Sequence, residues 1–255
     1  MKMPLRYYQD FLITLTQKEF SLRYRYTWLG FFWTIINPVL QMLSLGLVFK
    51  LFARVDIDHY FIFLFVGLVP WNFFSQSLHQ TTPIIIAKRH LLTKSNFPKE
   101  FLPLSIILVN LLHFLVAMGI ALVAVVMNYQ LSWLKLLFVL LSLMWLVGFT
   151  GGLSLLVSAM TVYFRDINFI VKNFLPLLFY VTPILYTQEI APAILQPLFY
   201  LNPMAGIIEL IRFGLSITST ISLTLVGVNL LISCLIFVLG WYVFAHLKPY
   251  FVDKL

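Results

Sequence analysis

The sequence predicts an all-α integral membrane protein with six transmembrane helices. Of the 255 residues, 61% are hydrophobic and only 10% are charged, whereas soluble domains carry about 25% charged residues. The apolar residues gather in long uncharged runs, and about 20 such residues in a helix cross a bilayer. We therefore expect a single transmembrane domain over residues 1–255.

The first expected element is an amphipathic helix over residues 4–22 that lies in the membrane interface. Its apolar residues Leu5, Tyr8, Leu12 and Leu15 recur at helical spacing, with polar residues on the other faces. No cleavable signal peptide is expected, because charges continue to Arg25 and the uncharged run that follows is too long for one.

The predicted spans cover residues 28–52, 60–87, 104–126, 136–162, 168–188 and 221–245. Pro38 is expected to kink the first span, since proline removes a backbone donor. The fifth span barely reaches across: its uncharged part is about 24 Å long at 1.5 Å per residue, against roughly 30 Å of hydrocarbon. In the fourth span, small residues should let another helix approach closely: Gly148, Gly151, Gly152 and Ser154.

The segment before the last span differs from a membrane span, because prolines and charges interrupt its apolar residues. We expect residues 190–216 to form short re-entrant helices that do not cross the membrane. The interrupting residues are Pro192, Pro197, Pro203, Glu209 and Arg212.

The positive charges predict the orientation. If both termini share one side, thirteen of the 17 lysines and arginines fall on that side, and only Lys50, Arg54, Lys135 and Arg212 fall opposite. Positive residues concentrate in the cytoplasm. Both termini and the loop at residues 87–103 are therefore expected in the cytoplasm, with residues 190–216 on the outward side.

The loop at residues 87–103 is a short charged island between two spans, and it is the expected docking element for a partner. Pro98 stops a helix from running through it. Its apolar residues could sit in a groove of a partner protein, while its basic residues could instead hold anionic lipid headgroups. The residues concerned are Lys88, Arg89, Leu91, Leu92, Lys94 and Phe97.

Several kinds of chemistry are not expected. The chain has no G-x-x-x-x-G-K-[ST] motif, so ATP must be bound by a partner, and no catalytic residue, cofactor or metal site is predicted. No carboxylate lies centrally in a span, which argues against proton- or sodium-coupled transport. His79 and His113 are interpreted as hydrogen-bonded packing residues. The single Cys234 excludes an internal disulfide, and the basic residues flank spans, which argues against nucleic-acid binding.

A set of short motifs, in order along nearly the whole chain, resembles the ABC-2 type permeases, and most closely those that export O-antigen, capsule or teichoic-acid polysaccharides. The motifs begin at Arg23-Tyr24-Arg25-Tyr26-Thr27-Trp28-Leu29-Gly30 with Trp33 and Pro38, and continue with Gly67-Leu68-Val69-Pro70-Trp71, Asn96-Phe97-Pro98, Arg165-Asp166, Thr182-Pro183-Ile184-Leu185-Tyr186 and Asn202-Pro203-Met204.

This resemblance implies a homodimer of six-span subunits in the cytoplasmic, or inner, membrane, bound to two copies of a separate ABC ATPase. It implies that ATP-driven closure pushes a lipid-linked glycan outward, as in lipopolysaccharide biosynthesis, and that residues 190–216 form the gate. The cytoplasmic entrance and interface helix would then involve Arg6, Arg23, Tyr24, Arg25, Tyr26 and Trp28.

Aromatic residues offer a link to sugars, because aromatic faces stack on sugar rings without requiring one hydroxyl pattern. They also anchor proteins at membrane interfaces, and both interpretations stay open. The candidate channel residues are Trp33, Trp71, Phe73, Phe74, Tyr180 and Tyr186. The alternative functions are an ABC-2 exporter of a drug or small lipid and, third, a channel or structural membrane protein.

Overall fold

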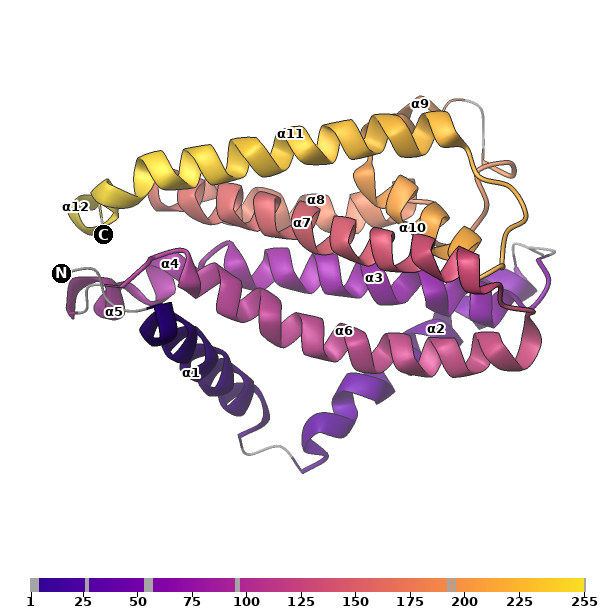
Figure 1. Cartoon of the computed structure of the whole chain (residues 1–255), viewed down its shortest axis with the longest axis horizontal. Coiled ribbons are helices and arrows are strands. Elements are labelled where there is room, and N and C mark those ends of the chain that lie inside the picture. Colours follow the sequence, from indigo (N-terminus) through magenta and orange to yellow (C-terminus); the bar gives the residue numbers. More distant parts are fainter. Residues whose placement is uncertain are drawn as a thin grey trace.

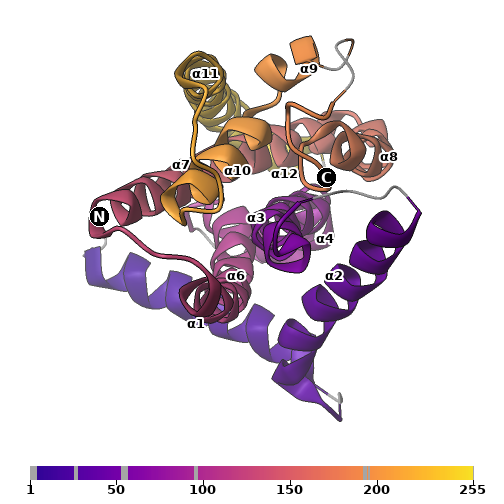
Figure 2. The same cartoon turned by 90° about the vertical axis from the view of Figure 1, so that its right-hand side faces the viewer.

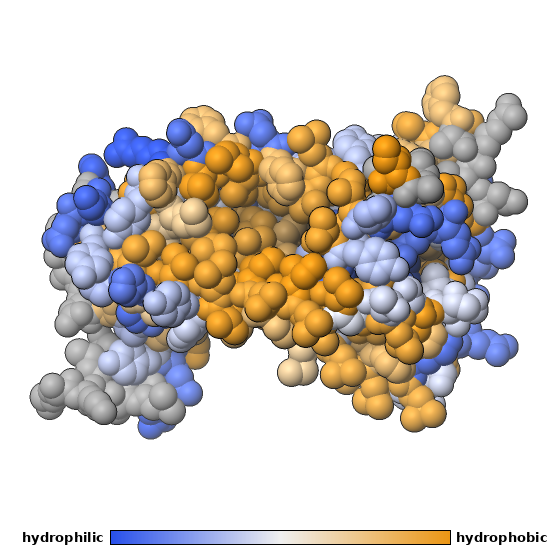
Figure 3. Space-filling view, turned by 90° about the horizontal axis from the view of Figure 1, so that it is seen from above, coloured by the Kyte–Doolittle hydropathy of each residue, from blue (hydrophilic) through white to orange (hydrophobic). Residues whose placement is uncertain are grey.

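The computed structural model describes residues 5–25, 28–52, 57–94, 97–191, 194 and 196–254, and within them every regular element is a helix. Most of the long helices run roughly along the longest axis of the molecule (Figure 1). On the face seen in Figure 3, hydrophobic residues fill a broad middle region and hydrophilic residues gather toward the two ends. The prediction of an all-helical membrane protein is confirmed.

Five helical segments of the described chain are long and apolar enough to cross a membrane. They contain α2 (Trp33–Leu51, preceded by the 3-10 helix Gly30–Phe32), α3 (Tyr60–Thr81), α6 (Phe101–Asn128), α7 (Trp133–Tyr163) and α11 (Leu223–Leu247). Helix α3 ends earlier than residue 87, because Pro83 interrupts it and a short helix α4 (Ile84–Ala87) follows. The other four overlap the predicted spans within a few residues.

Helix α8 (Asp166–Val181) occupies the position of the predicted fifth span, but it has only 16 residues. At 1.5 Å per residue it is about 24 Å long, which is short of the roughly 30 Å hydrocarbon core. It stops because Thr182 precedes Pro183 and adopts the extended backbone that this position favours. The described chain thus has five segments long and apolar enough to span a membrane, and the shorter α8 at the position of the predicted fifth span.

Two short helices, α9 (Gln196–Leu201) and α10 (Pro203–Gly214), lie in the segment predicted to form the gate. Helix α10 begins with Pro203 behind Asn202, whose side chain accepts a hydrogen bond from the Met204 backbone N–H at 3.1 Å. It packs against α3, α7 and α11.

Asn229, fully buried in α11, ties both short helices to that span. Its Nδ2 donates to the carbonyls of Phe199 and Tyr200, and its Oδ1 accepts from the Gly206 backbone N–H at 2.8 Å. Because one amide satisfies three backbone groups, α9 and α10 are held at a defined place beside the spans.

Helix α3 forms the centre of the bundle, and α2 lies at its edge (Figure 2). The most apolar window of α3 is 72% buried inside the chain, whereas that of the segment containing α2 is only 6% buried. At the edge also lies α1 (Leu5–Tyr24), which packs against α6. A span with so few contacts in its own chain is available to face lipid, a pore or another subunit.

Helices α7 and α11 cross at very short distance through two glycines. A Cβ built on Gly240 would lie 2.0 Å from the Gly152 carbonyl oxygen, and one on Gly152 would lie 2.5 Å from the Phe237 Cα. The predicted close approach is therefore confirmed at Gly152. Within this chain no helix approaches Gly148 or Gly151 so closely, since a Cβ there would meet nothing within 4 Å.

Gly240→Ala is expected to lower the amount of folded protein in the membrane several-fold. The added methyl group meets backbone rather than a movable side chain, so the two helices must separate, and overpacking costs roughly 1–3 kcal/mol or more. The matched control is Gly227→Ala in the same helix, where a Cβ meets nothing within 4 Å. Membrane abundance and thermal stability in detergent measure the effect, and equal values for both variants would contradict the crossing.

Candidate functional site: polar cavities between the spans

A polar seam runs between α2 and α3 inside the apolar part of the molecule. On each helix its residues recur every three or four positions, which places them on one face. Asn72 Nδ2 donates to Gln41 Oε1 at 2.8 Å and joins the two helices. The polar seam consists of Thr34, Asn37, Gln41 and Ser44 on α2, and of Asn72, Ser75, Gln76 and His79 on α3.

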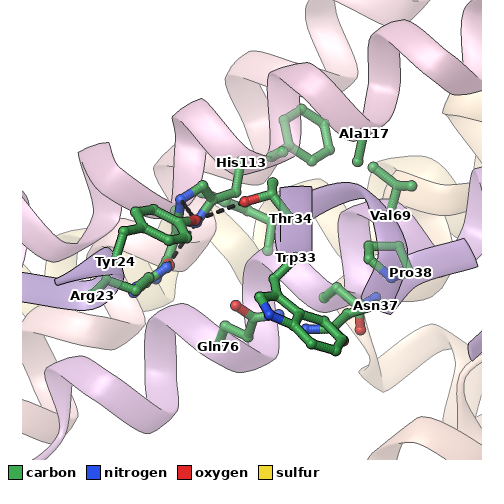
Figure 4. A pocket seen from close by; sticks show the side chains of 14 residues that line it. Arg23, Tyr24, Trp33, Thr34, Asn37, Pro38, Val69, Gln76, His113 and Ala117 are labelled. Atoms are coloured by element: carbon green, nitrogen blue, oxygen red, sulfur yellow. Dashed lines mark hydrogen bonds between the residues drawn. The ribbon is translucent and has the colours of Figure 1, made fainter. Parts of the chain in front are cut away.

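The first cavity on the seam has a volume of about 280 Å³. Figure 4 shows Arg23 and Tyr24 beside His113 and Thr34 on one side of it, and Trp33 with Asn37 and Gln76 on another. The end of α1, the start of α2 and the middle of α3 and α6 supply these side chains. The cavity thus combines one cation, several amides and aromatic rings.

Arg23 supplies the positive charge of this cavity and is held by neutral groups. It hydrogen-bonds Asn110 Oδ1 at 2.9 Å, His113 Nδ1 at 2.7 Å and Gln80 Oε1. Burial lowers the pKa of Arg23, but an arginine remains protonated at neutral pH. None of these three partners is a carboxylate, although the nearby Glu19, which pairs with Lys88, favours the charged form of Arg23.

Tyr24 completes this network at the same end of the cavity. Its hydroxyl lies 2.6 Å from His113 Nε2 and 2.6 Å from Thr34 Oγ1. His113 is therefore a hydrogen-bonded residue, as predicted, and it connects α1 to α6. The end of α1 is consequently fastened to the spans through polar contacts.

A second cavity, with a volume of about 480 Å³, continues the seam between α2, α3 and α8. Asn72 lines both cavities. The aromatic residues around the second cavity are Trp71, Phe179 and Tyr180, and its polar residues include Gln41 and His79.

Four of the six predicted channel aromatics line the two cavities of the polar seam. Trp33 and Phe73 line the first cavity, and Trp71 and Tyr180 line the second.

The other two candidates, Phe74 and Tyr186, line neither of these cavities. Phe74 is 1% exposed and stacks on Phe149 with ring centroids 5.3 Å apart. The Tyr186 hydroxyl donates to the Tyr180 carbonyl at 2.8 Å. Within one subunit, Phe74 is thus a packing residue of the core.

The structure corrects the expected placement of Leu92 and Phe97 on an exposed docking face. Leu92 is 6% and Phe97 is 8% exposed, because both pack into an apolar cluster of their own chain that includes Phe251. We call this cluster the loop seat: Ile84, Ile85, Leu92, Phe97, Leu102, Phe244 and Phe251. Any role of Leu92 and Phe97 in coupling therefore acts through the position of the loop.

The other residues of the island present charge rather than apolar surface. Arg89 in α5 (Arg89–Lys94) is exposed and Leu91 is half-buried. Lys88 forms an ion pair with Glu19 of α1 at 2.5 Å. The carbonyl of Pro98 accepts from the Phe101 N–H at 3.0 Å, and the side chain of Lys94 lies outside the described part.

The remaining entrance residues lie around α1. Arg6 is exposed near its start, Arg25 is exposed in the turn after its end, and Trp28 is 99% exposed. Tyr26 lies outside the described residues. Of the described residues Arg6, Arg25 and Trp28, none lines the first cavity, which is lined by Arg23 and Tyr24.

The predicted gate residues occupy different environments. Pro197 lies in α9 with an exposed side chain, Pro203 is buried at the start of α10, and Pro192 lies outside the described residues. Glu209 accepts hydrogen bonds from Ser222 N at 2.6 Å and from Gln188. Burial raises the pKa of Glu209, and these hydrogen bonds oppose the increase.

Arg212 of α10 is a buried cation, only 4% exposed. It donates to the carbonyls of Pro183 at 2.7 Å, Ile184 at 2.8 Å and Phe63 at 3.2 Å. Gly67 leaves room for it, since a Cβ there would lie 2.7 Å from Arg212 Nη2. Arg212 thus joins α10 to α3 and to the segment after α8.

The polar seam was not anticipated from the sequence, although its signal is present there. Positions 34, 37, 41 and 44 are polar within an otherwise apolar run, and a spacing of three, four and three residues marks one helical face. Because amides and hydroxyls carry no charge, they do not interrupt the uncharged run that predicts the span.

Comparison with known proteins agrees with this architecture. The profile of the ABC-2 type transporter family matches residues 11–216, which extends from α1 to the end of α10. The chain belongs to the ABC-2 type transporter family. It is therefore a multi-pass transport subunit rather than an enzyme, and an ABC-2 permease requires a separate ATPase subunit.

Curated relatives within this ABC-2 family are similar over much or all of the chain. An O-antigen export system permease protein RfbA of Klebsiella pneumoniae is 32% identical, with 100% of this chain and 98% of that protein covered. A protein of the same name in Myxococcus xanthus is 41% identical over 70% of this chain and 69% of its own length.

Proposed function

We propose that this ABC-2 permease exports a polysaccharide, carried on a lipid, across the cytoplasmic membrane with energy from a partner ATPase. The observation that carries the proposal is the full-length similarity to an O-antigen export permease. The polar seam supports it independently, because amides, hydroxyls and aromatic faces are the groups that contact sugars.

The proposed path for the glycan follows the two cavities of the polar seam. Trp33 and Tyr180 offer rings with 40% and 59% exposure, and Asn37, Asn72 and Gln76 offer amides beside them. Aromatic rings accept successive sugar units without selecting one hydroxyl pattern, and amides donate and accept hydrogen bonds with many. A polymer can therefore slide between equivalent contacts.

A homodimer would enclose this path. Asn37, Ser44 and Gln76 are exposed on the surface of the single subunit within the spans, and polar side chains at membrane depth normally face a cavity or another helix. Two subunits related by a two-fold axis would cover them. In this assembly α8 completes the set of six spans in each subunit, and α9 and α10 form the outward gate. Two ATPases bind on the cytoplasmic side.

We propose that both termini and the island 87–103 lie in the cytoplasm, as the distribution of lysines and arginines predicts. Helices α4, α5 and α12 (Phe251–Lys254) lie together at one end of the molecule, and the turn between α6 and α7 lies at the other (Figure 1). Arg23 would then attract the phosphate of a lipid-linked glycan at the cytoplasmic entrance, since arginine binds phosphate strongly. Lys88 and Arg89 would face the ATPase, which binds the ATP.

Removal of the gene tests the proposed function. Cells that lack the chain are expected to lose surface polysaccharide and to accumulate lipid-linked polymer inside, and the wild-type gene should restore export. Unchanged surface polymer, together with increased sensitivity to a toxic small molecule, would instead indicate a drug exporter.

Trp33→Ala is expected to lower export per permease molecule several-fold, whereas Trp33→Phe should retain most of it. Alanine removes the aromatic face, and phenylalanine keeps a ring. Trp33 suits this test better than Trp71, which is 4% exposed, so that alanine there would also open a void in the core. Surface polymer normalised to permease abundance measures the effect.

The matched control for Trp33 is Trp133→Ala at the start of α7. Trp133 is 87% exposed and lines neither cavity of the polar seam. If Trp33 only anchors the protein at the interface, both alanine variants should change abundance and leave normalised export unchanged. That result would remove Trp33 from the path.

A further inference from the structure

A third cavity, with a volume of about 500 Å³, lies away from the polar seam. It is bounded by the first turn of α3, the segment after α8, the end of α10 and the segment leading into α11. It shares no lining residue with the first two cavities. These elements meet at the end of the molecule opposite α4 and α5 (Figure 1), which is the outward end in the proposed orientation.

The lining of this third cavity mixes polar and apolar groups. It includes five hydroxyl side chains, the amide of Gln188, two carboxylates and Arg212, together with Phe63, Pro183, Ile217 and Ile221. Hydroxyls, amides and carboxylates are the groups that exchange hydrogen bonds with sugar hydroxyls. Its volume falls within the roughly 300–1,000 Å³ range of small-molecule sites.

Two buried polar atoms at this cavity lack partners in the described chain. They are Arg212 Nε and Thr218 Oγ1. The other guanidinium nitrogens of Arg212 donate to three backbone carbonyls, so the Nε–H alone remains. Leaving buried donors unsatisfied costs free energy. Both atoms are almost fully covered, so a ligand with hydroxyl groups would supply their partners after a small shift of these side chains.

The charges around the cavity favour a neutral ligand over an anion. Glu189 and Glu209 both line it, against the single cation Arg212. Glu209 hydrogen-bonds Ser222 and Gln188 rather than Arg212. A phosphate group would therefore meet two carboxylates, whereas sugar hydroxyls can donate to those carboxylates and accept from Arg212.

We propose that this outward cavity binds neutral sugar units of the glycan as they leave the path, an inference that rests on the proposed function. The site holds the emerging polymer beside the gate helix α10, because Glu209 and Arg212 both belong to that helix. Occupancy of the site would consequently reduce backward movement of the polymer between transport steps.

Thr218→Val tests this site with little risk to folding, because valine has the same shape and removes a hydroxyl that has no partner in the described chain. Export per permease molecule is expected to fall about threefold to tenfold, the change typical of one lost hydrogen bond. The matched control is Thr150→Val in α7, which removes another buried hydroxyl without a described partner, away from every cavity considered. Equal export by the two variants would overturn the proposal.

Cysteine labelling tests occupancy directly. In a Cys234→Ala background, Ser219→Cys on the rim should react more slowly with an impermeant maleimide, in spheroplasts, while the cell makes polymer than after polymer synthesis is switched off. Gln130→Cys, exposed in the turn between α6 and α7, should react equally in both states.

The outcomes of the labelling separate this inference from the proposed function. Equal rates at Ser219→Cys in both states, with normal polymer on the surface, would overturn the sugar site and leave the export function standing. If a strain that lacks the chain keeps normal surface polymer, both the proposed function and the sugar site are overturned. Failure of both cysteines to react from outside would overturn the outward placement.

Discussion

Phe251→Asp is expected to uncouple the permease from its ATPase. Phe251 is fully buried in the loop seat, where its ring meets that of Phe244 edge-on at 5.5 Å. An unpaired carboxylate in this cluster costs several kcal/mol, so α12 should leave the seat. Leu92, on α5 against which α12 packs, then loses part of the apolar cluster around it, and the loop no longer holds the position at which the ATPase binds.

Two polar contacts strengthen the link between the C-terminal segment and the loop. Lys99 Nζ donates to the Lys248 carbonyl at 2.8 Å, and Lys248 forms an ion pair with Glu100 at 3.2 Å. Both contacts depend on the placement of the 3-10 helix Lys248–Tyr250. Displacement of α12 is therefore expected to disturb the end of the loop that leads into α6.

The measurement is ATPase activity of the purified complex, together with the amount of ATPase that co-purifies. Phe251→Asp should lower permease-dependent ATPase activity by about tenfold or more, since each 1.4 kcal/mol corresponds to a factor of ten. Val252→Asp is the matched control, because Val252 is adjacent and 41% exposed. Full coupling by Phe251→Asp would show that the loop seat does not position the docking loop.

The loop seat shows what the sequence could and could not predict about coupling. The island at residues 87–103 was recognised because charges interrupt two apolar runs. The burial of Leu92 and Phe97 could not be predicted because the residues around them are distant in sequence: Phe97 meets the ring of Phe11 in α1, and Phe251 of the same cluster lies more than 150 residues away. An apolar residue in a loop has the same pattern whether its own chain or a partner covers it.

For the spans, too, the sequence predicts some features and not others. The positions of the five long spans follow from the length of the uncharged runs, whereas α8, at the predicted fifth span, has only 16 residues. The rotation of each helix about its own axis cannot be predicted from these runs. Gly152 contacts α11 whereas Gly148 and Gly151 do not, although all three are small residues in one run. Helix rotation is set by packing with neighbours, so a single span does not reveal which of its faces lines a cavity.

Arg23→Leu is expected to lower export at least tenfold while the permease remains in the membrane. The substitution removes the cation of the first cavity and leaves Asn110 and Gln80 without their charged donor. Hydrogen bonds to charged groups contribute roughly 1.5–3 kcal/mol each, and the proposed phosphate would lose its partner. Arg23→Lys should export at an intermediate level, because lysine keeps the charge but lacks the planar set of donors.

Lys18→Leu provides the matched control for Arg23. It removes the same charge from an exposed position of α1 that does not line the first cavity, so the effect of net charge on membrane insertion is equal in both variants. Surface polymer normalised to permease abundance should separate them by about tenfold, as expected for 1.4 kcal/mol or more of lost interaction. Equal normalised export by Arg23→Leu and Lys18→Leu would show that the cavity at the end of α1 is not the entrance, since a cation that binds the substrate cannot be removed without effect.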